Sequence, residues 1–174
     1  MSTSNTFLYN VAGTPPLLSF HTLSAQLNNG HSFEFSQLKG KKVLIVNTAS
    51  DCGYTPQYEE LQKLHEMGKD FLHIIAFPSN DFKEQEKGDD KAIAAFCEKY
   101  RVSFPLAKKT SVVKSSRQHP VYEWLTSKEK NGWNDQEPTW NFSKYLINEN
   151  GILTHYFEPF VSPLSRLVLQ AVTA

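Results

Sequence analysis

Residues 43–58 read VLIVNTASDCGYTPQY, and in them an unbroken apolar run meets a cysteine and then the start of a helix. The four aliphatic residues 43–46 predict a strand buried on both faces, as in a parallel or mixed sheet. Thr55 and Pro56 are the residue types favoured at the N-cap and the first helical position. Cys52 is therefore expected at a strand-to-helix junction, beside the unpaired N–H groups of a helix N-terminus.

A cysteine at such a junction has two interpretations. The thiolate is the reactive form of cysteine, and a helix N-terminus stabilises it. The helix dipole alone contributes only about 1 kcal/mol or less at an exposed site, so further hydrogen-bond donors would be needed. The alternative is that Cys52 is an ordinary small buried hydrophobe. The local stretch by itself leaves both interpretations open.

Composition and charge exclude several classes of protein. The 174 residues suit one domain, and 18 basic against 18 acidic side chains give a formal charge of zero. This balance gives no electrostatic case for a nucleic-acid partner or a stable membrane association. Two cysteines fit a reducing compartment better than a disulfide scaffold. With no signal-like run, membrane-spanning run or metal-ligand spacing, we expect a cytoplasmic protein without a metal or cofactor.

The apolar pattern predicts alternating strands and helices. The expected elements are a hairpin of strands 18–24 and 31–35, a strand at 43–46, a helix at 56–67, a strand at 71–77, a helix at 89–100, a short helix at 120–126, a polar loop at 131–139, a hairpin of strands 140–148 and 152–157, and a helix opened by Ser162 and Pro163. Residues 1–16 predict a loose arm. The strand, helix and strand of residues 43–77 predict a right-handed βαβ unit with parallel strands. Active residues belong at the carboxyl ends of such strands, where Cys52 follows one and Gln85 the next.

Three motifs carry a resemblance to the glutathione peroxidase family. NTASDCGYTPQYEEL at 47–61 resembles the family's peroxidatic-cysteine motif, FPSNDFKEQEKG at 77–88 its second motif, and WNFSKYL at 140–146 its third. They follow the family's order, and the resemblance runs from about residue 18 to the C-terminus. It implies a single peroxidase domain over residues 1–174. The implied fold is α/β and thioredoxin-like, with an N-terminal β-hairpin extension and an inserted helix.

The resemblance also implies roles for five residues. The peroxidase tetrad maps onto Cys52, Gln85, Trp140 and Asn141, and the amide and indole N–H groups of the last three can bond a thiolate. Taken singly, each of those three has an ordinary structural interpretation as a core, cap or loop residue. Cys97, in FCEKYRVSFP, is similar to the resolving cysteine of thioredoxin-dependent members, although its helical spacing fits a buried inert thiol equally well. A bridge to Cys52 would require its helix to unwind.

The function implied by the resemblance is a thiol peroxidase acting in the response to oxidative stress. It would reduce hydrogen peroxide and organic or lipid hydroperoxides to water or alcohols, and thioredoxin or glutathione would reduce its intramolecular disulfide. Thioredoxin is favoured because the Cys97 segment is similar to that of thioredoxin-dependent members, and no distinct cluster of arginines is evident for the glutathione carboxylates. The short connection of residues 127–139 implies a monomer with an open site. Two alternatives stay open: a peroxide sensor that passes its oxidation to a partner protein, and a non-catalytic thioredoxin-fold binding module with structural cysteines.

Five residues depart from the family's pattern, and two of them, Ser79 and Asp81, carry no assigned catalytic role. Asp51 stands where a basic residue is often found, and its carboxylate would oppose formation of the Cys52 thiolate. Lys83 and Glu84 stand where two glycines are common. Side chains at these two positions are expected to hinder the approach of Gln85 to Cys52.

Overall fold

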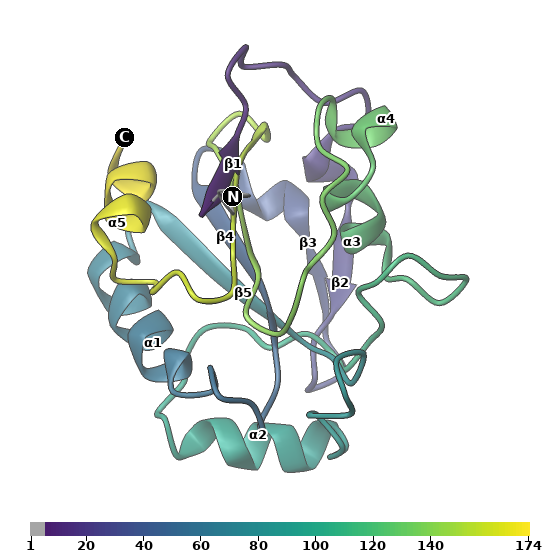
Figure 1. Cartoon of the computed structure of the whole chain (residues 1–174), viewed down its shortest axis with the longest axis vertical. Helices are drawn as coiled ribbons and strands as arrows, with labels where there is room; N and C mark the ends of the chain where they lie inside the picture. The colour runs from purple at the N-terminus through teal and green to yellow at the C-terminus, as the bar shows by residue number, and fades with distance from the viewer. Residues whose placement is uncertain (1–5) are drawn as a thin grey trace, which may run out of the picture.

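The computed structural model describes residues 6–174, and these fold around one central β-sheet (Figure 1). In chain order its strands are β1 (Phe7–Tyr9), β4 (Lys42–Thr48), β5 (Leu72–Pro78), β6 (Lys144–Ile147) and β7 (Leu153–Phe157). They lie in the order β1-β7-β6-β4-β5, with β4 and β5 parallel and the other neighbours antiparallel. Every residue of β4 is buried, which confirms the predicted central strand.

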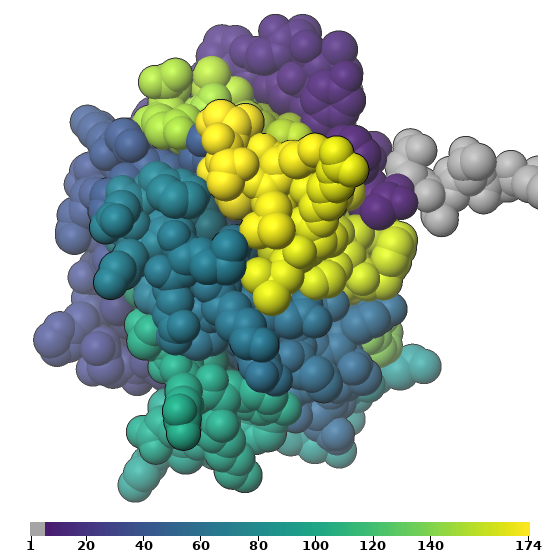
Figure 2. Space-filling view, turned by 90° about the vertical axis from the view of Figure 1, so that its left-hand side faces the viewer, coloured from purple at the N-terminus to yellow at the C-terminus, as the bar shows by residue number. Residues whose placement is uncertain are grey.

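The other elements cover the two faces and one end of this sheet. They are the 3-10 helices η1 (Phe20–Thr22) and η2 (Phe35–Leu38), the hairpin strands β2 (Ser24–Gln26) and β3 (Ser32–Glu34), and the helices α1 (Gln57–Gly68), α2 (Asp90–Glu98), α3 (Pro120–Leu125), α4 (Lys128–Asn131) and α5 (Arg166–Thr173). Helices α1 and α5 lie on one side, α3 and the hairpin on the other, and α2 crosses the end (Figure 1). Figure 2 views the side of α1 and α5 and shows their segments packed together.

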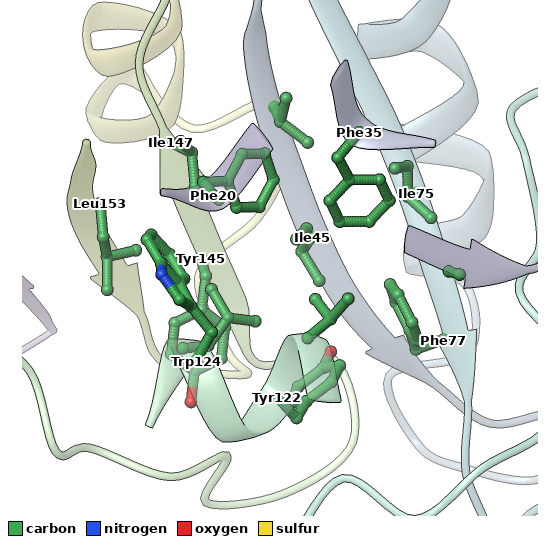
Figure 3. Close-up of a cluster of buried hydrophobic side chains, with 14 of the residues drawn as sticks. Phe20, Phe35, Ile45, Ile75, Phe77, Tyr122, Trp124, Tyr145, Ile147 and Leu153 are labelled. Carbon is green, nitrogen blue, oxygen red and sulfur yellow. The ribbon is translucent and has the colours of Figure 1, made fainter. Parts of the chain in front are cut away.

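The side chains of β4 enter two apolar cores alternately. Val43 and Ile45 belong to an aromatic-rich core on the α3 side (Figure 3), whereas Leu44 and Val46 belong to a core beneath α1 and α5. Other members of the aromatic-rich core are Phe20, Phe35, Ile75, Phe77, Tyr122, Trp124 and Tyr145. Burial on both faces of the strand is the reason that residues 43–46 form an unbroken apolar run.

The topology confirms the expected thioredoxin-like α/β fold. Strand β4, helix α1 and strand β5 form the βαβ unit with parallel strands, and β6, β7 and α5 add an antiparallel hairpin and a closing helix. The hairpin β2-β3 is the N-terminal extension, and α2 is inserted after β5. Within residues 6–174, no helix has both the length and the apolar character needed to cross a membrane.

The expected loose arm was wrong for residues 7–16. Strand β1 pairs with β7, because the rings of Phe7 and Tyr9 each stack 6.2 Å from the ring of His155. Asn10 then closes a turn, where its side chain both donates to and accepts from the backbone of Thr14. The partner strand lies at the other end of the chain, so the local sequence could not predict this pairing. The remaining part of the expected arm, residues 1–5, lies outside the described residues.

Two other predicted elements are present but begin later than expected. Residues 20–22 form η1 instead of strand, because the hydroxyl of Ser19 accepts the His21 N–H as a cap, and the hairpin's first strand starts only at β2. Helix α5 begins after Ser165, whose hydroxyl accepts the Val168 N–H at 3.3 Å, and not at the predicted Ser162. The short helix α4 begins inside the connection and ends at the first residue of the predicted polar loop.

Candidate active site

The four residues predicted as a tetrad come from three segments that end at the same edge of the sheet. Parallel strands bring their carboxyl ends to one edge, and an antiparallel neighbour begins there. Cys52 follows β4, Gln85 follows β5, and Trp140 with Asn141 precedes β6. The sheet topology therefore gathers all four at the end that α2 crosses (Figure 1).

Cys52 lies partly exposed in the turn between β4 and α1. Its N–H donates to the Thr55 hydroxyl at 3.0 Å, and that hydroxyl donates to the carbonyl of Ala49 at 2.9 Å, so buried Thr55 ties both sides of the turn. The N–H of Tyr54 donates to the Cys52 sulfur at 3.4 Å and is the single hydrogen bond to that sulfur in the described part of the chain. The turn therefore aims one backbone donor at the sulfur.

Two amide side chains are joined beside this turn. The Asn141 side-chain amide donates to the side-chain oxygen of Gln85 at 2.9 Å. The backbone carbonyl of Gln85 accepts the N–H of Asp51, the residue before Cys52, at 3.0 Å. Gln85 is thus tied to both segments, while its own side-chain NH₂ donates to no group among residues 6–174. That NH₂ is a donor left for a bound molecule.

Trp140 differs from the other two tryptophans of the chain. The indole N–H groups of Trp124 and Trp133 each donate to a backbone carbonyl, at 2.7 and 2.8 Å. The indole N–H of Trp140 has no acceptor within the part of the chain that the structure describes. Its ring is half-exposed and lies 5.6 Å from the ring of Phe82. Trp140 therefore presents a second unused donor at the same edge.

The strand predicted over residues 140–148 was wrong for its first four residues, which form a turn. Phe142 adopts a φ of 68°, in the left-handed region where a strand cannot continue. Asn47, at the end of β4, holds the turn: its side-chain amide donates to the Trp140 carbonyl at 3.0 Å, and its carbonyl accepts the Phe142 N–H at 2.6 Å. Our sequence reasoning had assigned no positioning role to Asn47.

Lys144 holds the same turn from below. It is fully buried, and its ammonium donates to the carbonyls of Phe142 at 2.7 Å and Pro159 at 3.0 Å. Burial lowers the pKa of Lys144 to about 7, against the opposing charges of Glu60 and Glu158. The sequence signal for this residue, which we missed, is a lysine inside the apolar run of a predicted strand.

Lys83 and Glu84 adopt φ values of 49° and 53°, in the left-handed region that glycine occupies without strain. The backbone nevertheless brings the Gln85 carbonyl to Asp51. Glu84→Gly is expected to raise the free energy of unfolding by about 0.5–1 kcal/mol, since relief of strain outweighs the entropy of glycine. Lys83→Gly should gain less stability, because it also removes an attraction between the Lys83 ammonium and the Trp140 ring, whose centre lies 5.8 Å away.

Urea unfolding of the variants measures this effect. Lys87→Gly is the matched control, since Lys87 is exposed in the same loop without a positive φ, and it should lose stability. Equal losses for Glu84→Gly and Lys87→Gly would contradict the strain assigned to Glu84.

Cys97 lies in the last turn of α2, and Cys52 packs against the core to which Cys97 belongs. The predicted core-facing orientation is confirmed, since Cys97 is 2% exposed and packs in the core beneath α1. Burial raises the pKa of its thiol to about 11. Both cysteines are free thiols.

A pocket of about 280 Å³ lies between the Cys52 turn and α2. Its walls include Ser50, Asp51, Gln85, Glu86, Ile93 and Phe96. Among residues 6–174 there is no group of three or more His, Cys, Asp or Glu side chains arranged to hold a metal ion. A free cysteine after the central strand of a thioredoxin-like fold, with unused amide and indole donors at the same edge, defines a thiol-dependent oxidoreductase.

Comparison with known proteins identifies the family. The family described as Glutathione peroxidase matches residues 20–126. The chain is 46% identical over 149 residues to the "Glutathione peroxidase homolog BsaA" of Halalkalibacterium halodurans, which covers 84% of this chain and 94% of that protein. It is 43% identical over 150 residues to the "Glutathione peroxidase-like peroxiredoxin 2" of Saccharomyces cerevisiae, covering 84% and 91%.

A solved structure agrees with these matches. The crystal structure of Trgpx in apo form superposes with a TM-score of 0.68 at 32% identity, covering 91% of this chain and 97% of that one. The chain belongs to the glutathione peroxidase family, and it is a thiol peroxidase.

Proposed function

We propose that Cys52 is the peroxidatic residue and that Gln85, Trp140 and Asn141 bind the peroxide beside it. The observation that carries the proposal is the pair of unused donors, the Gln85 NH₂ and the Trp140 indole N–H, at the sheet edge where Cys52 lies. Asn141 orients Gln85 through their 2.9 Å hydrogen bond. Donors held in advance at the oxygens of a peroxide stabilise the charge that develops when the O–O bond breaks.

In the first step the Cys52 thiolate attacks one oxygen of a hydroperoxide. The S–O bond forms as the O–O bond breaks, the sulfur is oxidised to a sulfenic acid, and the leaving oxygen takes a proton and departs as water or an alcohol. The Trp140 and Gln85 donors are suited to hold that leaving oxygen.

In the second step Cys97 resolves the sulfenic acid. The Cys97 sulfur attacks the Cys52 sulfur, the S–O bond breaks, and water leaves as the disulfide forms. We expect the last turn of α2 to open for this attack, because Cys97 is buried there and its carbonyl accepts the N–H groups of Tyr100 and Val102, at 3.0 and 3.2 Å, just beyond the helix. Helix ends open at lower free energy than helix centres.

We further propose thioredoxin as the reductant of this disulfide. The chain has three arginines, at positions 101, 117 and 166, and they do not form a cluster in the sequence for the carboxylates of glutathione. Hydroperoxides, including lipid hydroperoxides, are the proposed substrates, and a monomer is the proposed form. The cytoplasmic location stays a prediction that rests on the two free thiols.

The test is the intact mass and free-thiol count of the reduced protein after one equivalent of hydrogen peroxide, without added reductant. The expected result is loss of two hydrogens and of both thiols, with a peptide that joins Cys52 to Cys97. An added oxygen on Cys52 with Cys97 still free would instead indicate a one-cysteine enzyme resolved by another molecule. No reaction at all would favour the binding-module alternative.

Cys97→Ser separates the two steps. The variant is expected to complete one turnover at the wild-type rate and then to lose thioredoxin-supported cycling, because the sulfenic acid has no second thiol to condense with. Peroxide consumption with thioredoxin and its reductase measures the cycling. Unchanged steady-state turnover would exclude Cys97 as the resolving residue.

A further inference from the structure

The carboxylate of Asp81 joins two segments that lie far apart in the sequence. Its Oδ2 atom accepts the Ser111 hydroxyl at 3.1 Å, the Val112 N–H at 2.6 Å and the Val113 N–H at 3.2 Å, across separations of 30 to 32 residues. Hydrogen bonds to a charged acceptor are roughly twice as strong as neutral ones. An exposed aspartate in a loop ordinarily bonds the backbone of its own turn, so three long-range bonds at one oxygen need an explanation.

The segment that donates these bonds is anchored in the core. Val112 is fully buried and belongs to the aromatic-rich core. Its carbonyl accepts the side-chain amide of Gln118 at 3.1 Å, and the Ser111 carbonyl accepts the N–H of His119, the N-cap of α3, at 2.9 Å. Asp81 therefore ties the loop that follows β5 to a fixed part of the molecule.

Phe82, the residue after Asp81, connects this tie to the active site. Its side chain packs against the aromatic-rich core, and its ring lies 5.6 Å from the ring of Trp140. The Lys83 ammonium, 5.8 Å from the centre of the same ring, comes from the same loop. The turn that precedes β6 fixes the backbone of Trp140, whereas these contacts from the loop fix the direction of its ring.

The far end of the loop is held without Asp81. There the Gln85 carbonyl accepts the Asp51 N–H at 3.0 Å, and the Gln85 side chain accepts the Asn141 amide at 2.9 Å. Between Asp81 and Gln85 the backbone passes through positions 83 and 84 in the left-handed region, a strained conformation for residues with side chains. The Asp81 bonds oppose relaxation of this strain. Their loss is therefore expected to move Phe82 and to leave Gln85 in place.

We propose that Asp81 is a positioning residue for the reaction with peroxide. Through Phe82 it fixes the direction of the Trp140 indole N–H, and this inference rests on the proposed role of that N–H as a donor to the leaving oxygen. Asp81 departs from the family's motif, so the resemblance assigns it no such role. A donor held in advance does not have to reorient as charge develops. Release of the ring therefore slows the first step and leaves the later thiol chemistry unchanged.

Asp81→Ala tests the inference, because it removes all three bonds. The reaction of the reduced protein with hydrogen peroxide, followed by rapid mixing without added reductant, should slow at least about fivefold, since a displaced donor loses part of its effect. Acrylamide should also quench the fluorescence of Trp140 more strongly than in wild type, because the ring loses its packing against Phe82. The Trp140 signal is the difference between each protein and its Trp140→Phe counterpart.

Asp135→Ala is the matched control. Asp135 is also an exposed aspartate whose carboxylate accepts a backbone N–H of another segment, that of Lys128 at 2.8 Å, but its bond holds α4 and not the loop after β5. The rate should stay within about twofold of wild type, with unchanged quenching. In a Trp140→Phe background, Asp81→Ala should likewise slow the reaction by less than about twofold, because the donor that it positions is absent.

Each result decides between the alternatives. A wild-type rate or wild-type quenching in Asp81→Ala would overturn the inference, as would equal losses of rate in Asp81→Ala and Asp135→Ala, or a loss that persists in full in the Trp140→Phe background. Should Asp81→Ala not fold, Phe82→Leu takes its place, since it removes the ring contact and keeps the carboxylate bonds; a wild-type rate would again overturn the inference. A wild-type rate in Trp140→Phe alone would instead overturn the proposed donor role of Trp140.

Discussion

Replacing Cys52 by serine is expected to lower the rate of peroxide reduction at least about a thousandfold, because a serine hydroxyl stays protonated at neutral pH and is a weak nucleophile. The fold should survive, because the Cys52 backbone N–H, and not its sulfur, bonds Thr55 to close the turn. Consumption of hydrogen peroxide with a dithiol reductant measures the activity, and circular dichroism checks the fold.

Cys97→Ser is the control for this experiment, since it removes the other thiol of the chain. Its first turnover should equal that of wild type, which separates the peroxidatic thiol from the resolving one. A Cys52→Ser protein that kept a tenth or more of the activity would show that the nucleophile lies elsewhere. The role assigned to the β4-α1 turn would then be wrong.

Lys144→Met is expected to have the second largest effect, a loss of about tenfold or more in peroxidase activity. The change leaves the Phe142 carbonyl without its buried donor, and an unsatisfied buried carbonyl costs about 1–3 kcal/mol. Phe142 follows Asn141 directly in a left-handed conformation, so its release displaces the Gln85–Asn141 pair. The activity loss should appear at saturating reductant, as a slower reaction with peroxide.

The same variant should alter how stability depends on pH. The folded-state pKa of Lys144 is about 7, whereas the unfolded chain keeps that proton to about 10.5. Between these values the unfolded state binds more protons, so this group makes the free energy of unfolding rise with pH by roughly 1 kcal/mol per unit. Below pH 7 both states hold the proton, and the rise is absent.

Urea unfolding of wild type and Lys144→Met at pH 6 and pH 9 measures this difference. The free energy of unfolding should rise more between pH 6 and pH 9 in wild type than in the variant. Lys42→Met is the control, because Lys42 is also buried in the sheet but bonds Glu149 and the Ala174 carbonyl, away from the site. It should lose stability and keep peroxidase activity. If the free energy of unfolding depended on pH identically in wild type and Lys144→Met, the rise with pH could not be assigned to Lys144.

Sequence and structure agree best where a pattern depends on local chemistry. The helix predicted at 89–100 begins at Asp90 because the Asp89 side chain accepts the Ala92 N–H at 2.8 Å, a cap visible in the sequence. The strand at 71–77 and the helices at 56–67 and 120–126 were likewise predicted to within two residues. In each of these elements, the spacing of the apolar residues and the residues that start and end the element lie within or next to the element itself.

Agreement fails where a partner lies far along the chain. Residues 7–9 carry no strand signal that outweighs the polar segment around them, and they become β1 only because β7, more than 140 residues later, offers an unpaired edge. Residues 140–143 have a strand-like composition, but Asn47 and Lys144 bond their backbone into a turn. Such bonds cannot be inferred from local periodicity.

Consecutive residues were enough to predict the central strand, the βαβ unit and the position of Cys52 after that strand, because they carry both the apolar run of a strand buried on both faces and the start signals of a helix. The folded chain was needed to show which donors at the sheet edge are unused, how Lys144 and Asn47 hold the Trp140 turn, and that Glu86 lies buried beside the pocket. Hydrogen-bond satisfaction and burial depend on residues that meet only when the sheet forms.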